Sequence, residues 1–193
     1  MAKERLETYK KKCEKECLTL AILDESGFSF VPNCNNTWAP VGETPILRET
    51  PGRHNHTGIG LIIRTPVLHL LTFFLMILKG VATFDDFVVL LTSLHFRTRK
   101  KVLILWDNLP THHAVQAYFE EERPGWFDFE YFPAYSPELN PVEGCWNLMK
   151  NVSLPNFVPT ADEELVREVM AAAMKINEEK KIPDCFKQAG ITP

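Results

Sequence analysis

The run VLILWDN, residues Val102–Asn108, decides the fold. Five apolar residues from Val102 to Trp106 are followed at once by Asp107 and Asn108. An unbroken apolar run of this length is typical of a strand that is buried on both faces, as in a parallel sheet. Such a strand delivers a carboxylate at its C-terminal edge, which is where open α/β sheets place their ligands.

A second apolar run lies upstream and has the same design. Residues Leu18–Leu23, LTLAIL, are apolar apart from Thr19, and the acid Asp24 follows them. The pattern predicts another buried strand that ends in a carboxylate. If the two strands are parallel neighbours, Asp24 and Asp107 lie side by side at one edge of the sheet.

A third acid is predicted at the start of a helix. Asn140 is a good N-cap, Pro141 suits the first helical position, and Glu143 falls at the third. Glu143 could simply complete a capping box, and an acid after a strand often starts a turn, so each acid alone is consistent with a structural role. The combination of three is more specific than any one of them.

Three carboxylates that converge on one edge repel each other and lose hydration, unless a cation neutralises them. Oxygen ligands without a partnering His or Cys favour Mg²⁺ or Mn²⁺. Two ions about 3.5 to 4 Å apart could activate a water, and later a DNA 3′-hydroxyl, on one side of a phosphate while they stabilise the leaving oxygen on the other. The acids therefore predict a two-metal-ion site.

The motifs together resemble the DDE endonuclease domain of Tc/mariner-like bacterial insertion-sequence transposases. The resemblance covers roughly residues 18–150, and 35 residues separate Asp107 from Glu143, close to the usual gap of the family. The segments that carry it are Asp24-Glu25-Ser26-Gly27-Phe28, Trp38-Ala39-Pro40 with Gly42 and Pro45, Asp107-Asn108-Leu109-Pro110 with His112, and Tyr135-Ser136-Pro137-Glu138-Leu139-Asn140-Pro141-Val142-Glu143 with Trp146 and Lys150.

The resemblance implies a ribonuclease-H-like fold, here a mixed five-stranded sheet flanked by helices. It also implies a metal-bound acid triad, which maps onto Asp24, Asp107 and Glu143, and cleavage at transposon ends followed by joining to target DNA. Four more residues are expected to support the acids or to contact nucleic acid: Asn108, His112, Asn140 and Lys150.

Two other functions are consistent with the sequence. One is a stand-alone ribonuclease-H-like nuclease that cleaves RNA–DNA hybrids or branched DNA without joining strands. The other is a catalytically silent transposase remnant that only assembles with a DNA-binding partner. Transposases of the resembled family usually carry a helix-turn-helix portion ahead of the catalytic domain. Because none is seen here, we expect it to be lost, truncated or separately encoded, and a homodimer is possible.

Length and composition indicate one well-buried domain. The chain has 193 residues, 45% of them hydrophobic and 24% charged, with a formal charge of −4 that argues against tight non-specific binding to nucleic acid by this chain alone. Five scattered cysteines suit a reducing compartment, and we expect a cytoplasmic bacterial protein, nucleoid-associated when bound to DNA, with no membrane segment. The predicted division is a charged helical lead-in at 1–17, the catalytic domain at 18–155 and a helical tail at 156–193.

The remaining elements follow from hydrophobic periodicity. Residues 54–78 predict two strands that meet the first strand antiparallel, with Val67–Leu78 in the core. Helices are expected at 83–96, 112–123 and 160–181, and a last strand at 127–132. The lead-in at 1–17 is expected to be a solvated helix, and Trp38 to pack beside the site.

Overall fold

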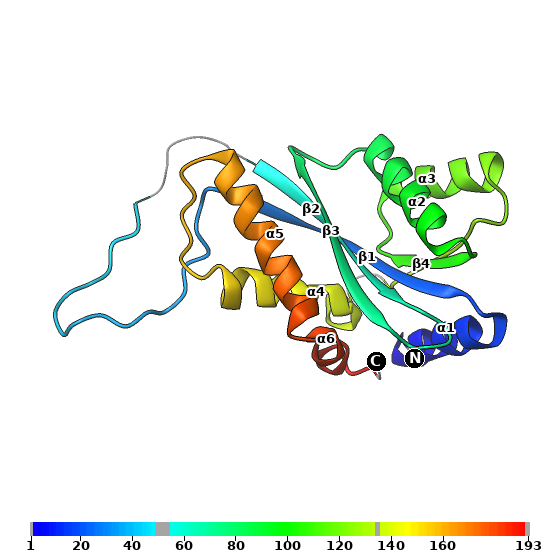
Figure 1. The fold of residues 1–193 in the computed structure, drawn as a ribbon, viewed down its shortest axis with the longest axis horizontal. Helices are drawn as coiled ribbons and strands as arrows, with labels where there is room; N and C mark the ends of the chain where they lie inside the picture. Colours follow the sequence, from blue (N-terminus) through cyan, green and yellow to red (C-terminus); the bar gives the residue numbers. More distant parts are fainter. Residues whose placement is uncertain (1, 49–54, 134–135, 192–193) are drawn as a thin grey trace.

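The computed structural model describes residues 2–48, 55–133 and 136–191, with the backbone alone for 2–6. His54 and Tyr135 therefore lie outside the described residues. Five strands form one mixed sheet in the order β3-β2-β1-β4-β5 (Figure 1). The strands are β1 (Thr19–Ser29), β2 (Asn55–Arg64), β3 (Leu71–Lys79), β4 (Val102–Trp106) and β5 (Phe127–Tyr131).

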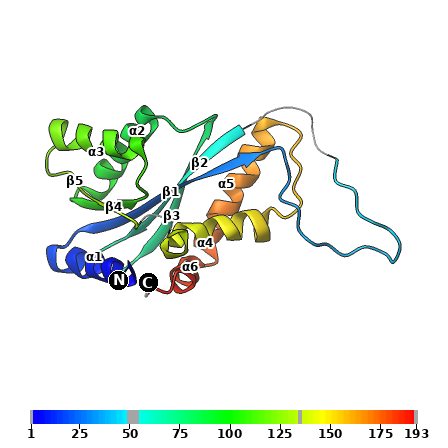
Figure 2. The same cartoon turned by 180° about the vertical axis from the view of Figure 1, so that it is seen from behind.

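Helices cover both faces of the sheet (Figure 2). One hydrophobic cluster joins α1, α4, α5 and α6 to one face, and a second joins α2 and α3 to the other. None of the helices within the described residues is long and apolar enough to cross a membrane. The helices are α1 (Ala2–Glu16), α2 (Phe84–Thr98), α3 (Pro110–Glu122), α4 (Pro141–Asn147), α5 (Asp162–Glu178) and α6 (Ile182–Gln188), with a short 3-10 turn η1 (Pro137–Leu139).

The predicted parallel pairing of the two buried strands is confirmed. Ile22 of β1 lies opposite Leu105 of β4, and Asp24 and Asp107 follow two residues later in each chain segment. The prediction that the first strand ends at Asp24 is wrong. β1 continues to Ser29 because β2 stays paired with it antiparallel beyond the end of β4.

The predicted start of α4 is confirmed. The side chain of Asn140 accepts a hydrogen bond from the backbone N–H of Val142, and Pro141 occupies the first turn. After Asn147 the helix continues as one stretch of π-helix, η2 (Leu148–Ser153). Glu143 and Lys150 therefore lie on one continuous helical rod.

Residues Ala2–Glu16 of the predicted lead-in form a helix as expected, but the prediction that this helix is solvated is wrong at Cys13. This side chain is fully buried in the cluster on the α4 face. Ion pairs also attach α1 to the sheet, from Glu14 to Arg64 of β2 and from Lys12 to Asp128 of β5. The helix is thus a packed part of the fold.

Three apolar side chains that were expected to pack, Val67, Leu68 and Trp38, are exposed. Val67 and Leu68 precede β3 in a turn and are 68% and 72% exposed, so the core part of Val67–Leu78 begins only with β3. After β1 the chain first stays on the body of the protein, where Asn33 and Asn35 are hydrogen-bonded to Asn151, and residues 36–48 then extend away from it (Figure 1). Trp38 lies on this arm with its side chain fully exposed, so the prediction that it packs beside the site is wrong.

The amide of Asn177 on α5 is bonded to the edge strand β3. Its Oδ1 accepts from the backbone N–H of Phe73 at 2.8 Å, and its Nδ2 donates to the backbone carbonyl of the same residue at 2.8 Å. These two bonds take the place of a neighbouring strand at that position. They fix α5 across the sheet and fix Phe73, which is buried, under it.

Replacing Asn177 with alanine removes both bonds. We expect Asn177→Ala to lower the free energy of unfolding by about 1 to 3 kcal/mol, because the buried peptide groups of Phe73 lose their partners. Urea unfolding followed by circular dichroism measures the change. The matched control is Lys175→Ala on the same helix, which removes an exposed ion pair with Glu179 and should change stability by less than about 0.5 kcal/mol. Equal effects of the two substitutions would contradict the role of Asn177.

Candidate active site

A cavity of about 480 Å³ opens at the edge of the sheet where β4 ends. The acids Asp24, Asp107 and Glu143 all contribute to its wall. They come from β1, the end of β4 and the first turn of α4, so segments distant in sequence meet here. The other lining residues are Asn108, Leu109, Phe132, Pro133, Ser136, Pro137 and Asn140.

Asp24 is the acid whose environment differs most from water. Burial raises the pKa of its carboxyl to about 7, opposed by the hydrogen bond from Trp146, while the negative charges of Glu143, Glu25 and Asp107 add to the rise. Trp146 donates its indole N–H to Oδ2 of Asp24 at 2.9 Å. A carboxyl in these surroundings gains from any nearby positive charge.

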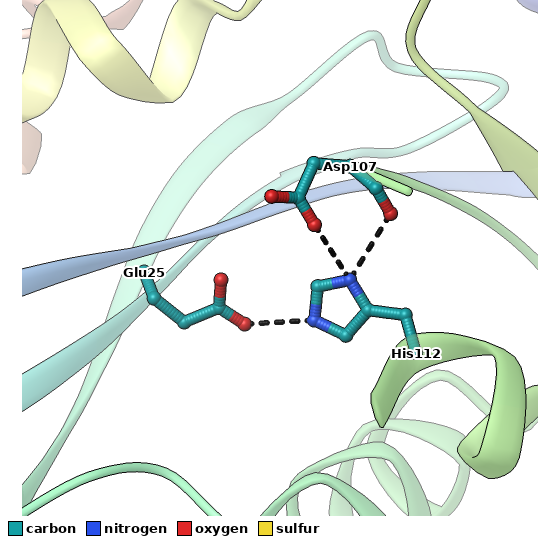
Figure 3. Close-up of side chains that lie close together, drawn as sticks. All are labelled: Glu25, Asp107 and His112. Atoms are coloured by element: carbon teal, nitrogen blue, oxygen red, sulfur yellow. Dashed lines mark hydrogen bonds and ion pairs between the residues drawn. The ribbon is translucent and has the colours of Figure 1, made fainter. Parts of the chain in front are cut away.

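His112 lies between two carboxylates (Figure 3). Its Nε2 is 2.9 Å from Oε1 of Glu25, and its Nδ1 is 2.8 Å from Oδ1 of Asp107 and 3.1 Å from the Asp107 carbonyl. Ligand-type atoms of the three side chains lie within 4.8 Å of one another. The ring, which belongs to α3, therefore contacts residues of β1 and of the end of β4.

Buried aromatic side chains hold the His112 ring in this position. Trp106 stacks on it with ring centroids 4.3 Å apart, and Phe87 meets it edge-on at 5.0 Å. Burial works to lower the pKa of His112, but its hydrogen bonds to Asp107 and Glu25 and the charge of Glu25 outweigh burial and raise the pKa to about 9. With its pKa at about 9 the ring is an imidazolium at neutral pH. Its Nε2–H donates to Oε1 of Glu25 and its Nδ1–H donates to the backbone carbonyl of Asp107, while Oδ1 of Asp107 lies within ion-pair distance.

A second cation borders the site on the side of α4. Lys150 is half-buried, its Nζ lies 2.7 Å from Oγ of Ser26, and it sits over the ring of Phe28 at 5.1 Å. Burial lowers the pKa of its ammonium group, and the charges of Glu143 and Asp24 oppose that change. The Lys150 ammonium group is thus held close enough to Asp24 and Glu143 to feel their charge, and among the described residues it forms no ion pair.

The two predicted asparagines have different settings. Asn140 is 7% exposed and serves as the N-cap of the helix that carries Glu143. Asn108 is exposed and its Oδ1 meets Nε2 of His113 on α3. Both line the same cavity as the three acids.

Sequence reasoning assigned no separate role to Glu25, Ser26 or Trp146, which entered only as members of the segments that carry the family resemblance. Glu25 is the neighbour of Asp24 on a strand, so alternation places it on the opposite face, toward α3. The available signal was the pair of adjacent acids Asp24 and Glu25, which puts one charge on each face of an otherwise apolar strand. No local pattern could have predicted the contacts of Trp146 with Asp24 and of Lys150 with Ser26, because each pair is separated by more than 120 residues in sequence.

The donor set of the cavity fits hard divalent cations. The titratable groups that line it are the three carboxylates, and His112 has both ring nitrogens engaged by acids. Carboxylate oxygens without thiolate or available imidazole are the ligands that Mg²⁺ and Mn²⁺ prefer. The crowding of negative charge around Asp24 adds a reason for a cation to bind there.

The mixed five-stranded sheet with helices on both faces is a ribonuclease-H-like fold. Within that class, the chain belongs to the DDE superfamily endonuclease family, whose model matches residues 19–165. The endonucleases of this family act with divalent metal ions. A search of curated proteins with the sequence gave no match.

Solved structures with the same fold include two complexes of the mariner transposase Mos1. The paired-end complex with Mg has a TM-score of 0.62 at 17% identity and covers 98% of this chain and 59% of that one. The paired-end complex with Mn has a TM-score of 0.54 at 18% identity and covers 95% and 61%. An intasome of simian T-cell lymphotropic virus has a TM-score of 0.51 at 13% identity, covering 82% and 48%. The chain thus spans about three-fifths of the length of the Mos1 transposase chains.

Replacing His112 tests the charge balance beside the acids. We expect His112→Gln to lower the free energy of unfolding by about 1 to 3 kcal/mol at pH 6, measured by urea unfolding in the presence of a chelator. The folded pKa is raised, so the stabilisation is complete below the unfolded pKa near 6.5 and is lost as pH rises through about 9. The difference from the wild type should therefore shrink at pH 9.5.

The control for this measurement is His113→Gln, because His113 is exposed on the same helix. It should change the free energy of unfolding at pH 6 by less than about 0.5 kcal/mol. A His112→Gln difference that is the same at pH 6 and pH 9.5 would contradict the imidazolium assignment.

Proposed function

We propose that the chain is the catalytic part of a DNA transposase, which cleaves phosphodiesters at transposon ends and joins them to target DNA. The observation that carries this proposal is the placement of Asp24, Asp107 and Glu143 on one cavity of a DDE-family fold. The Mos1 complexes with DNA ends lend support, since they share the fold over nearly the whole chain.

In this proposal Asp24, Asp107 and Glu143 would hold two Mg²⁺ or Mn²⁺ ions, with Asp24 shared by both ions. When bound, the ions would activate water or a DNA 3′-hydroxyl and stabilise the leaving oxygen of the phosphodiester. The protein groups fix position and charge in advance, which is the main requirement for in-line phosphoryl transfer. No protein nucleophile is needed.

The supporting residues have separate roles in the same proposal. His112 holds Asp107 by its imidazolium, and Asn140 anchors the turn that presents Glu143. Asn108 lies exposed at the cavity and could reach a DNA phosphate or sugar. Lys150 supplies a positive charge for phosphate beside the acids.

The partners follow from the same reaction. We propose that DNA is bound together with a helix-turn-helix portion that reads the transposon ends. We also propose that two catalytic chains pair, supported by the projecting arm with its exposed Trp38, Val41 and Ile46. We propose residues 18–155 as the catalytic unit, preceded by the helical lead-in at 1–17 and followed by the helical tail at 156–193. A DNA substrate favours a cytoplasmic location.

Nicking of supercoiled plasmid in the presence of Mn²⁺ tests the function. We expect the wild type to convert plasmid to the open circle and Asp107→Asn to lose at least about a hundredfold in rate, because one ligand of the proposed ions becomes neutral. The matched control is Asp85→Asn, which neutralises an exposed acid at the start of α2 and should nick as the wild type does. Agarose gels of timed samples provide the measurement.

The outcomes also separate the alternatives. Equal nicking by the wild type and Asp107→Asn, or nicking in chelator, contradicts a metal-bound triad. Cleavage of RNA–DNA hybrids without joined DNA products would favour a stand-alone nuclease. Binding of DNA by the wild type without cleavage would favour a silent remnant that acts through assembly.

The role of Lys150 is tested by the salt dependence of DNA binding. Each phosphate that a cationic side chain neutralises adds about 0.9 to the slope of log affinity against log salt concentration. We expect Lys150→Gln to lower that slope by about one, measured by fluorescence anisotropy with a labelled duplex in Ca²⁺ to prevent cleavage. Lys187→Gln, at an exposed ion pair on α6, should leave the slope unchanged. An unchanged slope for Lys150→Gln would remove this residue from the DNA contact.

A further inference from the structure

Trp146 links the helix of one candidate acid to the side chain of another. It follows Glu143 by three residues on α4 and is 3% exposed. Its indole N–H donates to Oδ2 of Asp24 on β1 at 2.9 Å. The bond occupies one lone pair of that oxygen, so it restrains the rotation of the Asp24 carboxylate.

Neighbours on three strands restrain the indole itself. Phe28 of β1 and Phe73 of β3 meet it edge-on, with ring centroids at 6.0 and 5.8 Å. Beneath it lies Gly60 of β2, the residue that is paired with Asp24 in the sheet. A Cβ at Gly60 would lie 2.6 Å from Cζ2 and Cη2 of the indole, a distance that forces the ring to move.

The restraint extends to the C-terminal helices. Phe73, which contacts the indole, is held through its backbone by Asn177 of α5. The position of Trp146 is thus determined by β1, β2, β3 and, through Phe73, by α5. A hydrogen-bond donor supported in this way is pre-organised, which is what a metal-holding carboxylate requires of its partner.

If the indole had only a structural role, any hydrogen-bond acceptor would satisfy its N–H group. A buried Trp N–H generally finds some acceptor, and a backbone carbonyl would satisfy it equally well. Here the acceptor is the partly buried carboxylate of Asp24 in the cavity, and the sheet residue opposite that carboxylate is a glycine whose missing side chain makes room for the ring. The acceptor of the indole N–H and the glycine at position 60 therefore both favour a fixed orientation of the Asp24 carboxylate.

We propose that Trp146 is a positioning residue for Asp24, which orients the carboxylate toward a bound divalent ion without contacting DNA. The inference rests on the proposed function, because it assumes that Asp24 holds such an ion. Gly60 contributes to the same positioning, because the absence of a side chain at this residue leaves room for the indole. Loss of the N–H should therefore weaken ion binding while the fold is kept.

Trp146→Phe removes the N–H and retains an aromatic ring in the pocket. We expect its affinity for Mn²⁺, measured from the free-ion signal in electron paramagnetic resonance, to fall about ten- to a hundredfold, as for other partners that orient metal ligands. Gly60→Ala, which displaces the indole, should change the affinity in the same direction. The control Trp126→Phe removes a half-buried indole that stacks on His95 on the other face of the sheet, and it should bind Mn²⁺ as the wild type does. Circular dichroism and thermal unfolding establish that each variant is folded.

A second measurement uses the wild-type protein and does not depend on how well a variant folds. The four indole N–H signals are resolved by ¹⁵N nuclear magnetic resonance, and Trp146 is assigned by elimination with Trp38→Phe, Trp106→Phe and Trp126→Phe. We expect the Trp146 signal to shift when Mg²⁺ is added and to shift in Asp24→Asn. A Trp146 signal that ignores both changes would overturn the positioning role.

The two proposals fail in different ways. If the wild type binds Mn²⁺, Asp107→Asn does not, and folded Trp146→Phe binds as tightly as the wild type, the positioning role is overturned and the metal site stands. If the wild type does not bind Mn²⁺, or if Asp107→Asn binds it equally, the proposed function is overturned, and this inference falls with it. A folded Trp146→Phe with weakened binding, beside a normal Trp126→Phe, supports the inference.

Discussion

Mutual repulsion among acids at one edge of the sheet is the constraint on which the site depends. The parallel pairing of β1 and β4 brings Asp24 and Asp107 to the same edge, and α4 adds Glu143 from the flank. Like charges gathered in partly buried surroundings are unfavourable unless positive charge or hydrogen-bond donors lie close by. Residues around the cavity supply both positive charge and hydrogen-bond donors.

Asp107 and Asp24 are compensated from different directions. The imidazolium of His112 serves Asp107 and Glu25 from the α3 side, and the indole of Trp146 serves Asp24 from the α4 side. Lys150 lies near but is bonded to Ser26. The compensation is partial, as the raised pKa of Asp24 indicates, and what remains suits a divalent cation. The fold thus keeps an excess of negative charge where the proposed chemistry needs it.

Sequence patterns predicted the elements whose signals are local. The unbroken apolar run before Asp107 and the cap at Asn140 depend on neighbours within a few residues, and both predictions are confirmed. The length of β1 could not be predicted in this way, because its second half is held by β2 and not by its own apolar pattern. Cys13 and Trp38 were misplaced for the same reason. Burial of one and exposure of the other depend on what the rest of the chain places beside them.

Gly60 and Trp146 are coupled through packing, because a Cβ at position 60 would lie 2.6 Å from Cζ2 and Cη2 of the indole. A larger residue at 60 causes crowding and a smaller residue at 146 leaves a void, so each change relieves the defect of the other and their effects on stability should not add. The smaller residue would still leave Asp24 without the indole N–H, so repacking the core does not restore that hydrogen bond.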